Sequence, residues 1–220
     1  TGNKLTAPFT ILCRTNARII EKILAFQKQK LHVVGGVNEI LNLAKSGYAL
    51  YSGNKDKVSH SKLKHFKSWE AMLHFNHKYQ DPDITFLAKL IKEHKGSFKK
   101  NINQIEDACY VEESMAEVIL STIHKSKGRE WDNVVLEDDF IIFTNEVPLE
   151  EILVYDVEEL NLIYVGVTRT KGNLLLASGV SSFLKRLEGF TAKRINLIID
   201  AELKNSAKVY QFPNRGIAAI

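Results

Sequence analysis

Short apolar runs and helically spaced apolar residues alternate along the first part of the chain. The run over 9–13 predicts a buried strand, and apolar residues three or four apart over 17–29 predict a helix. A second strand follows over 32–34 and stops at a pair of glycines, and a second helix follows over 40–51. This β-α-β-α order predicts a parallel sheet whose strands are joined by crossover helices.

Residues 53–104 interrupt this order. Their apolar side chains recur three to six residues apart without a strand signal, so we expect an amphipathic helical insertion. Phe66 and Trp69 belong to this apolar stripe, which favours a place in the core, although both rings could instead stack on bases. His74 and His77 share a helix face, but the spacing places no third metal ligand beside them.

After the insertion, the pattern predicts three further strands, over 118–122, 133–136 and 173–177. A helix over 158–168 precedes the last strand, and Ser181 is predicted to cap another helix that runs through Leu187. Two weak β-prone pieces lie in the tail, at 195–199 and 208–212.

These elements predict an α/β fold with a parallel, RecA-like sheet flanked by helices. The first part of the sheet domain is expected over 1–52 and the second over 114–220, with the helical insertion over 53–113 between them.

The composition is that of a globular domain, with 45% hydrophobic and 25% charged residues, which excludes disordered, collagen-like and coiled-coil proteins. No apolar run approaches the roughly 20 residues that a membrane span needs, so no membrane association is expected. Cys13 and Cys109 lie far apart, which suggests a reducing compartment and no structural metal. The chain begins at Thr1 without a signal pattern and looks like a piece of a longer protein.

The net charge of +4 is unevenly distributed. Residues 1–52, 53–104 and 161–220 carry +5, +6 and +6, whereas 105–160 carry −13. Three basic blocks around one acidic block suggest a polyanionic partner, although solvated surfaces would give the same pattern. The lysines of the insertion could contact DNA phosphates.

Three polar stretches adjoin predicted strands. The stretch 121–132 connects two buried strands and offers a hydroxyl, an imidazole, ammonium groups and a glycine for phosphate contacts, or it is simply a polar connection. Arg169 and Lys171 end the helix 158–168, where cations commonly complement the helix dipole. Asn16 follows the first strand and could be a helix N-cap.

Together, the segments ILCRTNA, HVVGGV, STIHKSKGREWDNVVL and EELNLIYVGVTRTK resemble, in this order, the C-terminal half of UvrD/Rep/PcrA-type superfamily 1 DNA helicases. The short insertion and the Asp138-Asp139-Phe140 segment look closer to the F-box DNA helicase branch. The resemblance implies that the chain is the second RecA-like domain, called 2A, of an ATP-dependent motor. The insertion stands in place of the family's 2B subdomain but is much shorter.

The resemblance also implies roles for individual residues. The residues that match the family's contacts to single-stranded DNA are Arg14, Asn16, Thr122, His124 and Lys127. Glu130 matches the residue that contacts the nucleotide sugar, with Gly128 beside it, and Arg169 matches the arginine finger that reaches the γ-phosphate. The family's Leu-Glu-Phe is Arg129-Glu130-Trp131 here, and the charge of Arg129 has no assigned role.

The sequence contains no GxxxxGK[ST] loop to cradle phosphates. ATP and Mg²⁺ are therefore expected to be bound mainly by an N-terminal RecA-like domain that carries motifs I to IV, and the isolated chain is expected to be inactive. The acidic run Glu137-Asp138-Asp139 could suggest a Mg²⁺ site, but without a phosphate loop caps and solvated carboxylates are favoured.

The expected function is that of the C-terminal motor domain of a 3′-to-5′ DNA helicase or translocase. Its expected partners are single-stranded DNA, single-strand/duplex junctions and the N-terminal RecA-like domain. The expected location is the bacterial cytoplasm or nucleoid, or the nucleus of a eukaryote. Two alternatives stay open, a non-enzymatic DNA-binding module and the helicase arm of a helicase–nuclease complex.

Overall fold

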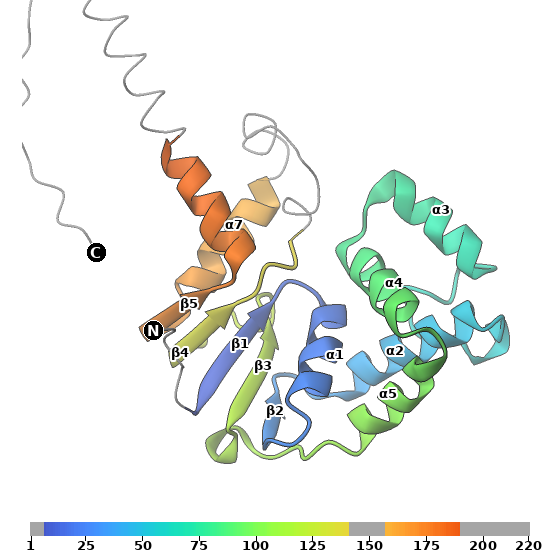
Figure 1. Ribbon diagram of the computed structural model, residues 1–220, viewed down its shortest axis with the longest axis horizontal. Coiled ribbons are helices and arrows are strands. Elements are labelled where there is room, and N and C mark those ends of the chain that lie inside the picture. Colours follow the sequence, from blue (N-terminus) through green and yellow to red (C-terminus); the bar gives the residue numbers. More distant parts are fainter. Residues whose placement is uncertain (1–6, 141–156, 190–220) are drawn as a thin grey trace, which may run out of the picture. The chain divides into compact units, whose positions relative to one another are not determined.

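The computed structural model describes residues 7–140 and 157–189 (Figure 1). The described residues up to Ser181 belong to one compact unit, and those from Ser182 onward belong to a second. The candidate residues all lie in the first unit, which is the one described below.

Five parallel strands form the sheet, in the spatial order β2-β3-β1-β4-β5 (Figure 1). Their bounds are Phe9–Cys13 for β1, Leu31–Val33 for β2, Val118–Thr122 for β3, Trp131–Leu136 for β4 and Thr170–Leu176 for β5. The predicted parallel sheet is confirmed. The central strand β1 pairs with both β3 and β4, which are far apart from it in the sequence.

Helices α1 (Asn16–Ala25) and α2 (Asn38–Tyr51) flank β2 in the sequence, as predicted. The insertion contains three helices, α3 (Trp69–Tyr79), α4 (Pro82–His94) and α5 (Phe98–Glu106), after a stretch of turns over 58–68. Single 3-10 turns lie at Lys55–Lys57, Lys95–Ser97 and Glu113–Met115. Helix α7 (Val157–Val167) precedes β5.

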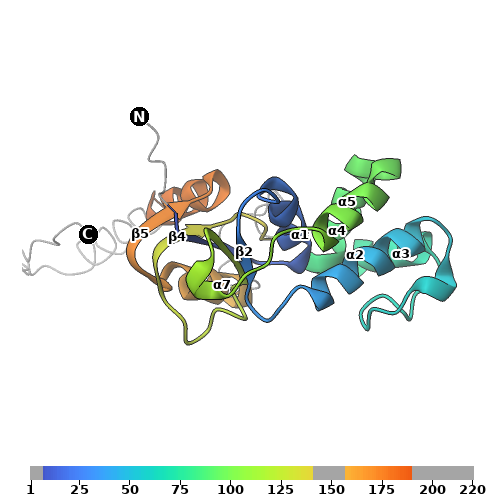
Figure 2. The ribbon, with the colours of Figure 1, turned by 90° about the horizontal axis from the view of Figure 1, so that it is seen from below.

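One continuous hydrophobic core joins the sheet to the inserted helices. Ile11 and Leu120 of the sheet belong to the same buried cluster as Trp69, Met72 and Phe98 of the insertion. Trp69 is only 7% exposed, which confirms the predicted core position of this ring. Helix α1 packs on α2, α4 and α5, so it lies between the sheet and the inserted helices (Figures 1 and 2). The domain boundaries at 52/53 and 113/114 stay a prediction.

Two predicted helix caps are wrong. Thr15, not Asn16, is the N-cap of α1, because its side chain accepts a hydrogen bond from the Arg18 N–H. Ser181 lies inside a helix that has begun by residue 178, since its own N–H donates to the Ala177 carbonyl at 3.0 Å. The β-prone pieces predicted at 195–199 and 208–212 lie outside the described residues.

Both cysteines are free thiols, Cys13 buried and Cys109 exposed. Within the ranges that the structure describes, none of the helices has the length and hydropathy needed to cross a bilayer.

Candidate nucleic-acid and nucleotide sites

The candidate residues lie at two opposite edges of the sheet. Arg14 directly follows β1 and Thr122 ends β3, so both lie at the carboxyl edge. Arg169 directly precedes β5, whose Thr170 pairs with Trp131 at the start of β4, so Arg169 lies at the amino edge. The two edges are separated by the length of β4, six residues or roughly 20 Å at about 3.3 Å per residue.

At the carboxyl edge, the guanidinium of Arg14 is held by α7. Arg14 Nε donates to Glu159 Oε1 at 2.7 Å, and the two side chains are 16% and 10% exposed. Glu159 lies in the first turn of α7, where a carboxylate also complements the helix dipole. This ion pair joins the end of β1 to the N-terminal end of α7.

The backbone that carries Arg14 is held by a buried carboxylate. Asp139, just beyond the end of β4, accepts hydrogen bonds of 2.8 Å from the N–H groups of Arg14 and Thr15 and from the Thr15 hydroxyl. Complete burial raises the pKa of Asp139 to about 6, although these donors and the charge of Arg18 act in the opposite direction. The turn that presents Arg14 and Asn16 therefore depends on a contact made 124 residues away.

The rest of the acidic run is paired with cations of α1. Arg18 contacts Glu137 and Asp138 at 3.3 and 2.8 Å, and Lys22 contacts Glu137 at 2.7 Å. The carboxylates of the run thus pair with cations of α1 or accept hydrogen bonds at its N-terminal end, whereas the sequence favoured caps and solvated carboxylates. Across 7–140 and 157–189, no three His, Cys, Asp or Glu side chains are grouped as metal ligands would be.

Asn16 links the carboxyl edge to the insertion. Its N–H donates to Asp83 Oδ1 at 2.9 Å, and Asp83 lies in the first turn of α4. Lys62, also in the insertion, contacts both Asp81 and Asp83, at 3.1 and 2.7 Å, so the carboxylate that accepts from Asn16 is paired with a cation as well. The side-chain oxygen of Asn16 is buried without a hydrogen-bond partner, which is a costly arrangement for an amide.

The connection from β3 to β4 begins at the same edge. Thr122 is buried and its hydroxyl accepts from the Lys125 N–H at 3.3 Å, whereas His124 and Lys127 are exposed. The pKa of His124 is lowered, first by partial burial and then by the positive charges of Arg14 and Lys127. The fold thus brings Arg14 and Lys127 near His124, and the carboxylates of Glu158 and Glu159 act on the same ring in the opposite direction.

The same connection ends at the amino edge, beside Arg169. The guanidinium of Arg169 donates to the carbonyls of Val165 and Arg129 at 2.9 and 3.3 Å and to the Thr168 hydroxyl at 3.1 Å. The backbone N–H of Trp131 donates to the backbone carbonyl of Arg169 at 3.0 Å. The exposed Glu130 lies between these two anchor points, and Gly128 nearby adopts φ 81°, a conformation that favours glycine.

Glu113 fastens both neighbours of Glu130, a role that sequence reasoning missed. Its carboxylate accepts from Arg129 Nη1 at 2.6 Å and from Trp131 Nε1 at 2.9 Å. Partial burial opposes ionisation, but the bonds from Trp131 and Arg129 and the Arg129 charge hold the pKa of Glu113 below its usual range. Arg129, left without a role by the sequence, is therefore half of an ion pair with the 3-10 turn before β3. The only local signal in the sequence was the charge of Arg129, which stands directly before the matched motif residue Glu130.

Helix α7 makes a second connection between the two edges. Its first turn holds Arg14 through Glu159 at the carboxyl edge, and the Arg169 segment after its end lies at the amino edge. Gly166 lets α7 approach the sheet, because a Cβ there would lie 2.7 Å from Leu136 Cδ1 and 3.5 Å from Ile123 Cδ1. The C-terminal part of α7 therefore lies close to Ile123, at the start of the 122–131 connection, and Arg169 beyond the helix bonds Arg129 near the end of that connection.

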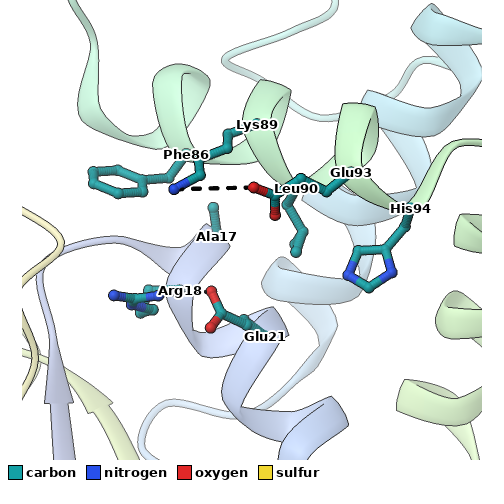
Figure 3. A pocket seen from close by; sticks show the side chains of 8 residues that line it. All are labelled: Ala17, Arg18, Glu21, Phe86, Lys89, Leu90, Glu93 and His94. Atoms are coloured by element: carbon teal, nitrogen blue, oxygen red, sulfur yellow. Dashed lines mark hydrogen bonds and ion pairs between the residues drawn. The ribbon is translucent and has the colours of Figure 1, made fainter. Parts of the chain in front are cut away.

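A cavity of about 230 Å³ opens between α1 and α4 (Figure 3). Its charged side chains pair locally, with Arg18 on Glu21 at 2.8 Å and Lys89 on Glu93 at 4.0 Å. None of the candidate nucleic-acid or nucleotide residues lines it, so it is separate from both edges. The lining residues are Ala17, Arg18, Glu21, Phe86, Lys89, Leu90, Glu93 and His94.

Residues 14–180 match the family described as the UvrD-like helicase C-terminal domain. The chain is 28% identical over 235 residues to F-box DNA helicase protein 1 of Schizosaccharomyces pombe, covering 95% of this chain and 26% of that protein. It is 25% identical over 216 residues to F-box DNA helicase 1 of Gallus gallus, covering 87% of this chain and 21% of that protein.

The chain thus spans about a quarter or less of the length of these relatives. Both relatives are F-box DNA helicases, the branch that the sequence predicted. The matched region covers well over half of the chain and includes both edges of the sheet. The protein belongs to the UvrD-like helicase C-terminal domain family.

Proposed function

We propose that this chain is the second motor domain of an ATP-dependent DNA helicase or translocase that moves 3′ to 5′ on single-stranded DNA. The observation that carries the proposal is the division of the candidate residues between two edges of one sheet. Two connections, residues 122–131 and α7, join those edges. Such an arrangement can transmit a change at one edge to the other.

The carboxyl edge is the proposed DNA site. Arg14 and Lys127 place positive charge beside the His124 ring, which suits phosphates, and Asn16 and Thr122 lie at the start of α1 and the end of β3. Partial burial and the charges of Arg14 and Lys127 lower the pKa of His124, which favours the neutral ring and contact with DNA through hydrogen bonds. Single-stranded DNA, also next to a duplex junction, is the proposed ligand.

The amino edge is the proposed nucleotide site. The Arg169 guanidinium contacts two carbonyls and a hydroxyl, and no carboxylate of the described residues lies within ion-pair distance of it. Its charge is thus available to an anion, and the exposed Glu130 and the open turn at Gly128 would hold the sugar side of ATP. ATP would supply the phosphoanhydride, and Arg169 would stabilise negative charge on the transferring phosphoryl, which is worth roughly 10³–10⁵ in rate.

The part of the chain that the structure describes offers no side-chain cluster for Mg²⁺. We therefore assign the metal and the phosphate-binding loop to an N-terminal RecA-like domain of the same protein, and we expect no ATP hydrolysis by this chain alone. Closure of the two domains on ATP would bring Arg169 to the nucleotide while the grip on DNA changes at the other edge. The proposed place of action is wherever chromosomal DNA lies, the nucleus in a eukaryote.

The test uses the full-length protein and separates the two edges. Arg169→Ala should abolish DNA-stimulated ATP hydrolysis while ATP and single-stranded DNA still bind, whereas His124→Ala should weaken DNA binding and spare the DNA-independent rate. Wild-type turnover by Arg169→Ala would remove the arginine finger. DNA binding without ATP hydrolysis in the wild-type protein would leave a non-enzymatic DNA-binding module instead.

A further inference from the structure

Three aromatic side chains form a row along the surface of α3. Phe66, just before the helix, lies with its ring centroid 5.3 Å from that of Phe75, and Phe75 lies 4.5 Å from Tyr79. Phe75 is 38% exposed and Tyr79 is 59% exposed. We call Phe66, Phe75 and Tyr79 the aromatic row.

Phe66 packs partly against the core, whereas Phe75 and Tyr79 of the aromatic row are exposed. Helix α3 packs mainly on α4, and its buried residues are Trp69 and Met72. Met72 lies three residues before Phe75 and seven before Tyr79, so the two exposed rings border the buried side of the helix. Figures 1 and 2 show α3 on the outer side of the inserted helices, away from the sheet. Two large rings are therefore left in contact with water on a helix that is already anchored, which is typical of a binding surface.

Lysines flank the aromatic row along the chain, and one of them lies over a ring of the row. Lys78 Nζ lies 5.1 Å from the centroid of the Tyr79 ring. Lys64, Lys67 and Lys78 are exposed and form no ion pair with the described residues. Glu70 is the single acidic residue of α3, and at five residues before Phe75 it lies about 140° around the helix from that ring.

The aromatic row leads toward the proposed DNA edge. Tyr79 ends α3, and two residues later Asp81 caps α4. Asp83 in the first turn of α4 accepts the hydrogen bond from the Asn16 backbone N–H. The row is thus connected through a short, charge-anchored corner to a residue that the proposed function places on DNA.

We propose that the aromatic row is a second binding site for single-stranded DNA, in which bases stack on Phe75 and Tyr79 while Lys67 and Lys78 contact phosphates. Rings flanked by cations are the arrangement that single-strand binders use, because every base has a face that can stack. The site rests on the proposed function, since it extends the DNA path from the carboxyl edge onto the insertion. It gives the insertion a task that the motor motifs leave undefined.

The test measures the affinity of the full chain for a fluorescein-labelled oligothymidylate by fluorescence anisotropy. Phe75→Leu/Tyr79→Leu keeps apolar volume but removes both rings, and it should weaken binding about fivefold or more. Lys78→Gln should lower the slope of affinity against salt by about 0.7, the value for one lost phosphate contact on a single strand. Lys100→Gln, an exposed lysine on α5 with no ion pair to a described residue, is the matched control and should change neither quantity.

A direct readout accompanies the affinities, because substituted rings could disturb α3. An oligonucleotide that carries 5-iododeoxyuridine should photo-cross-link to Tyr79 or Phe75 of the wild-type chain, as mapped by mass spectrometry. Wild-type affinity of Phe75→Leu/Tyr79→Leu with no cross-link on α3 would overturn the second site, while loss of binding in His124→Ala would still support the proposed function. If neither the wild-type chain nor His124→Ala bound the oligonucleotide, this result would instead count against the proposed function. A dimer in sedimentation that the leucine variant abolishes would assign the row to a second copy of the chain and overturn the proposal.

Discussion

The Arg169 guanidinium donates to the backbone carbonyl of Arg129, and the backbone N–H of Trp131 donates to the backbone carbonyl of Arg169. The residue proposed to act on ATP thus also fastens the end of α7 to the connection between β3 and β4. Arg169 has a structural role in this fold that any kinetic test must separate from catalysis.

We predict that Arg169→Ala lowers the free energy of unfolding of the chain by about 1 kcal/mol, because it removes three partly solvated hydrogen bonds. Urea denaturation without nucleotide measures this effect. Lys171→Ala is the control, since the 3.9 Å contact of Lys171 with the exposed Asp132 should contribute almost nothing. Equal stability of Arg169→Ala and wild type would show that the contacts only orient the side chain.

Glu113 is predicted to position Glu130. Glu113→Gln weakens the anchors of Arg129 and Trp131 on both sides of Glu130, so the KM for ATP of the full-length protein should rise roughly 3- to 10-fold while kcat changes less. The neighbouring Glu112→Gln removes the same charge from an exposed side chain that caps nothing, and its KM should stay at the wild-type value. A fall in kcat at constant KM would assign Glu113 to a different step.

The ionisation of Asp139 is predicted to oppose folding. Its pKa is about 6 in the fold and 3.8 as a model carboxyl, so the folded chain binds more protons between these values. Stability contributed by such a group falls as the pH rises from about 4 to about 6, by an amount on the order of 3 kcal/mol, and is flat above that range.

The measurement for Asp139 compares urea denaturation of wild type and Asp139→Asn across this pH range, because other carboxylates titrate there as well. The stability of wild type relative to the variant should decrease with rising pH. If the difference increased instead, the three hydrogen bonds that Asp139 accepts would outweigh its burial, and its folded pKa would be below 3.8.

Gly172 is predicted to be required where β5 meets β4. A Cβ at Gly172 would lie 2.7 Å from the backbone carbonyl oxygen of Asp132, at the irregular pairing between Trp131 and Asn133. Gly172→Ala should therefore lower the unfolding free energy by about 1–3 kcal/mol, since strand backbone must move. Gly96→Ala faces open space at an ordinary φ, and calorimetry should show its melting temperature unchanged or slightly raised.

Much of the fold could be predicted from local patterns. The strands β1 and β3 have the bounds expected from their apolar runs, because a strand buried on both faces must be apolar at nearly every position. The starts of β4 and β5 were missed, by two and three residues, because Asp132 interrupts the apolar run of β4 and β5 begins with Thr170, Lys171 and Gly172. Trp131 and Thr170 are strand residues only because they pair with each other.

The candidate site was predicted as a set of residues but not as an arrangement. From the sequence, 121–132 reads as one polar loop, whereas the parallel sheet places Thr122 at one edge and Glu130 at the other. Asn16 and Thr15 are both good capping residues, and the contacts of Thr15 with the distant Asp139 accompany its selection as the cap.

The sequence by itself determined the α/β class, the helical insertion and membership in the helicase family, because periodicity and ordered motifs record how each segment is buried and what it carries. Only the tertiary structure decided that Arg14 pairs with Glu159, that Arg129 pairs with Glu113 and that three rings line the outside of α3. Ion pairs and shared surfaces depend on which distant segments the fold brings together, and no local pattern carries that information.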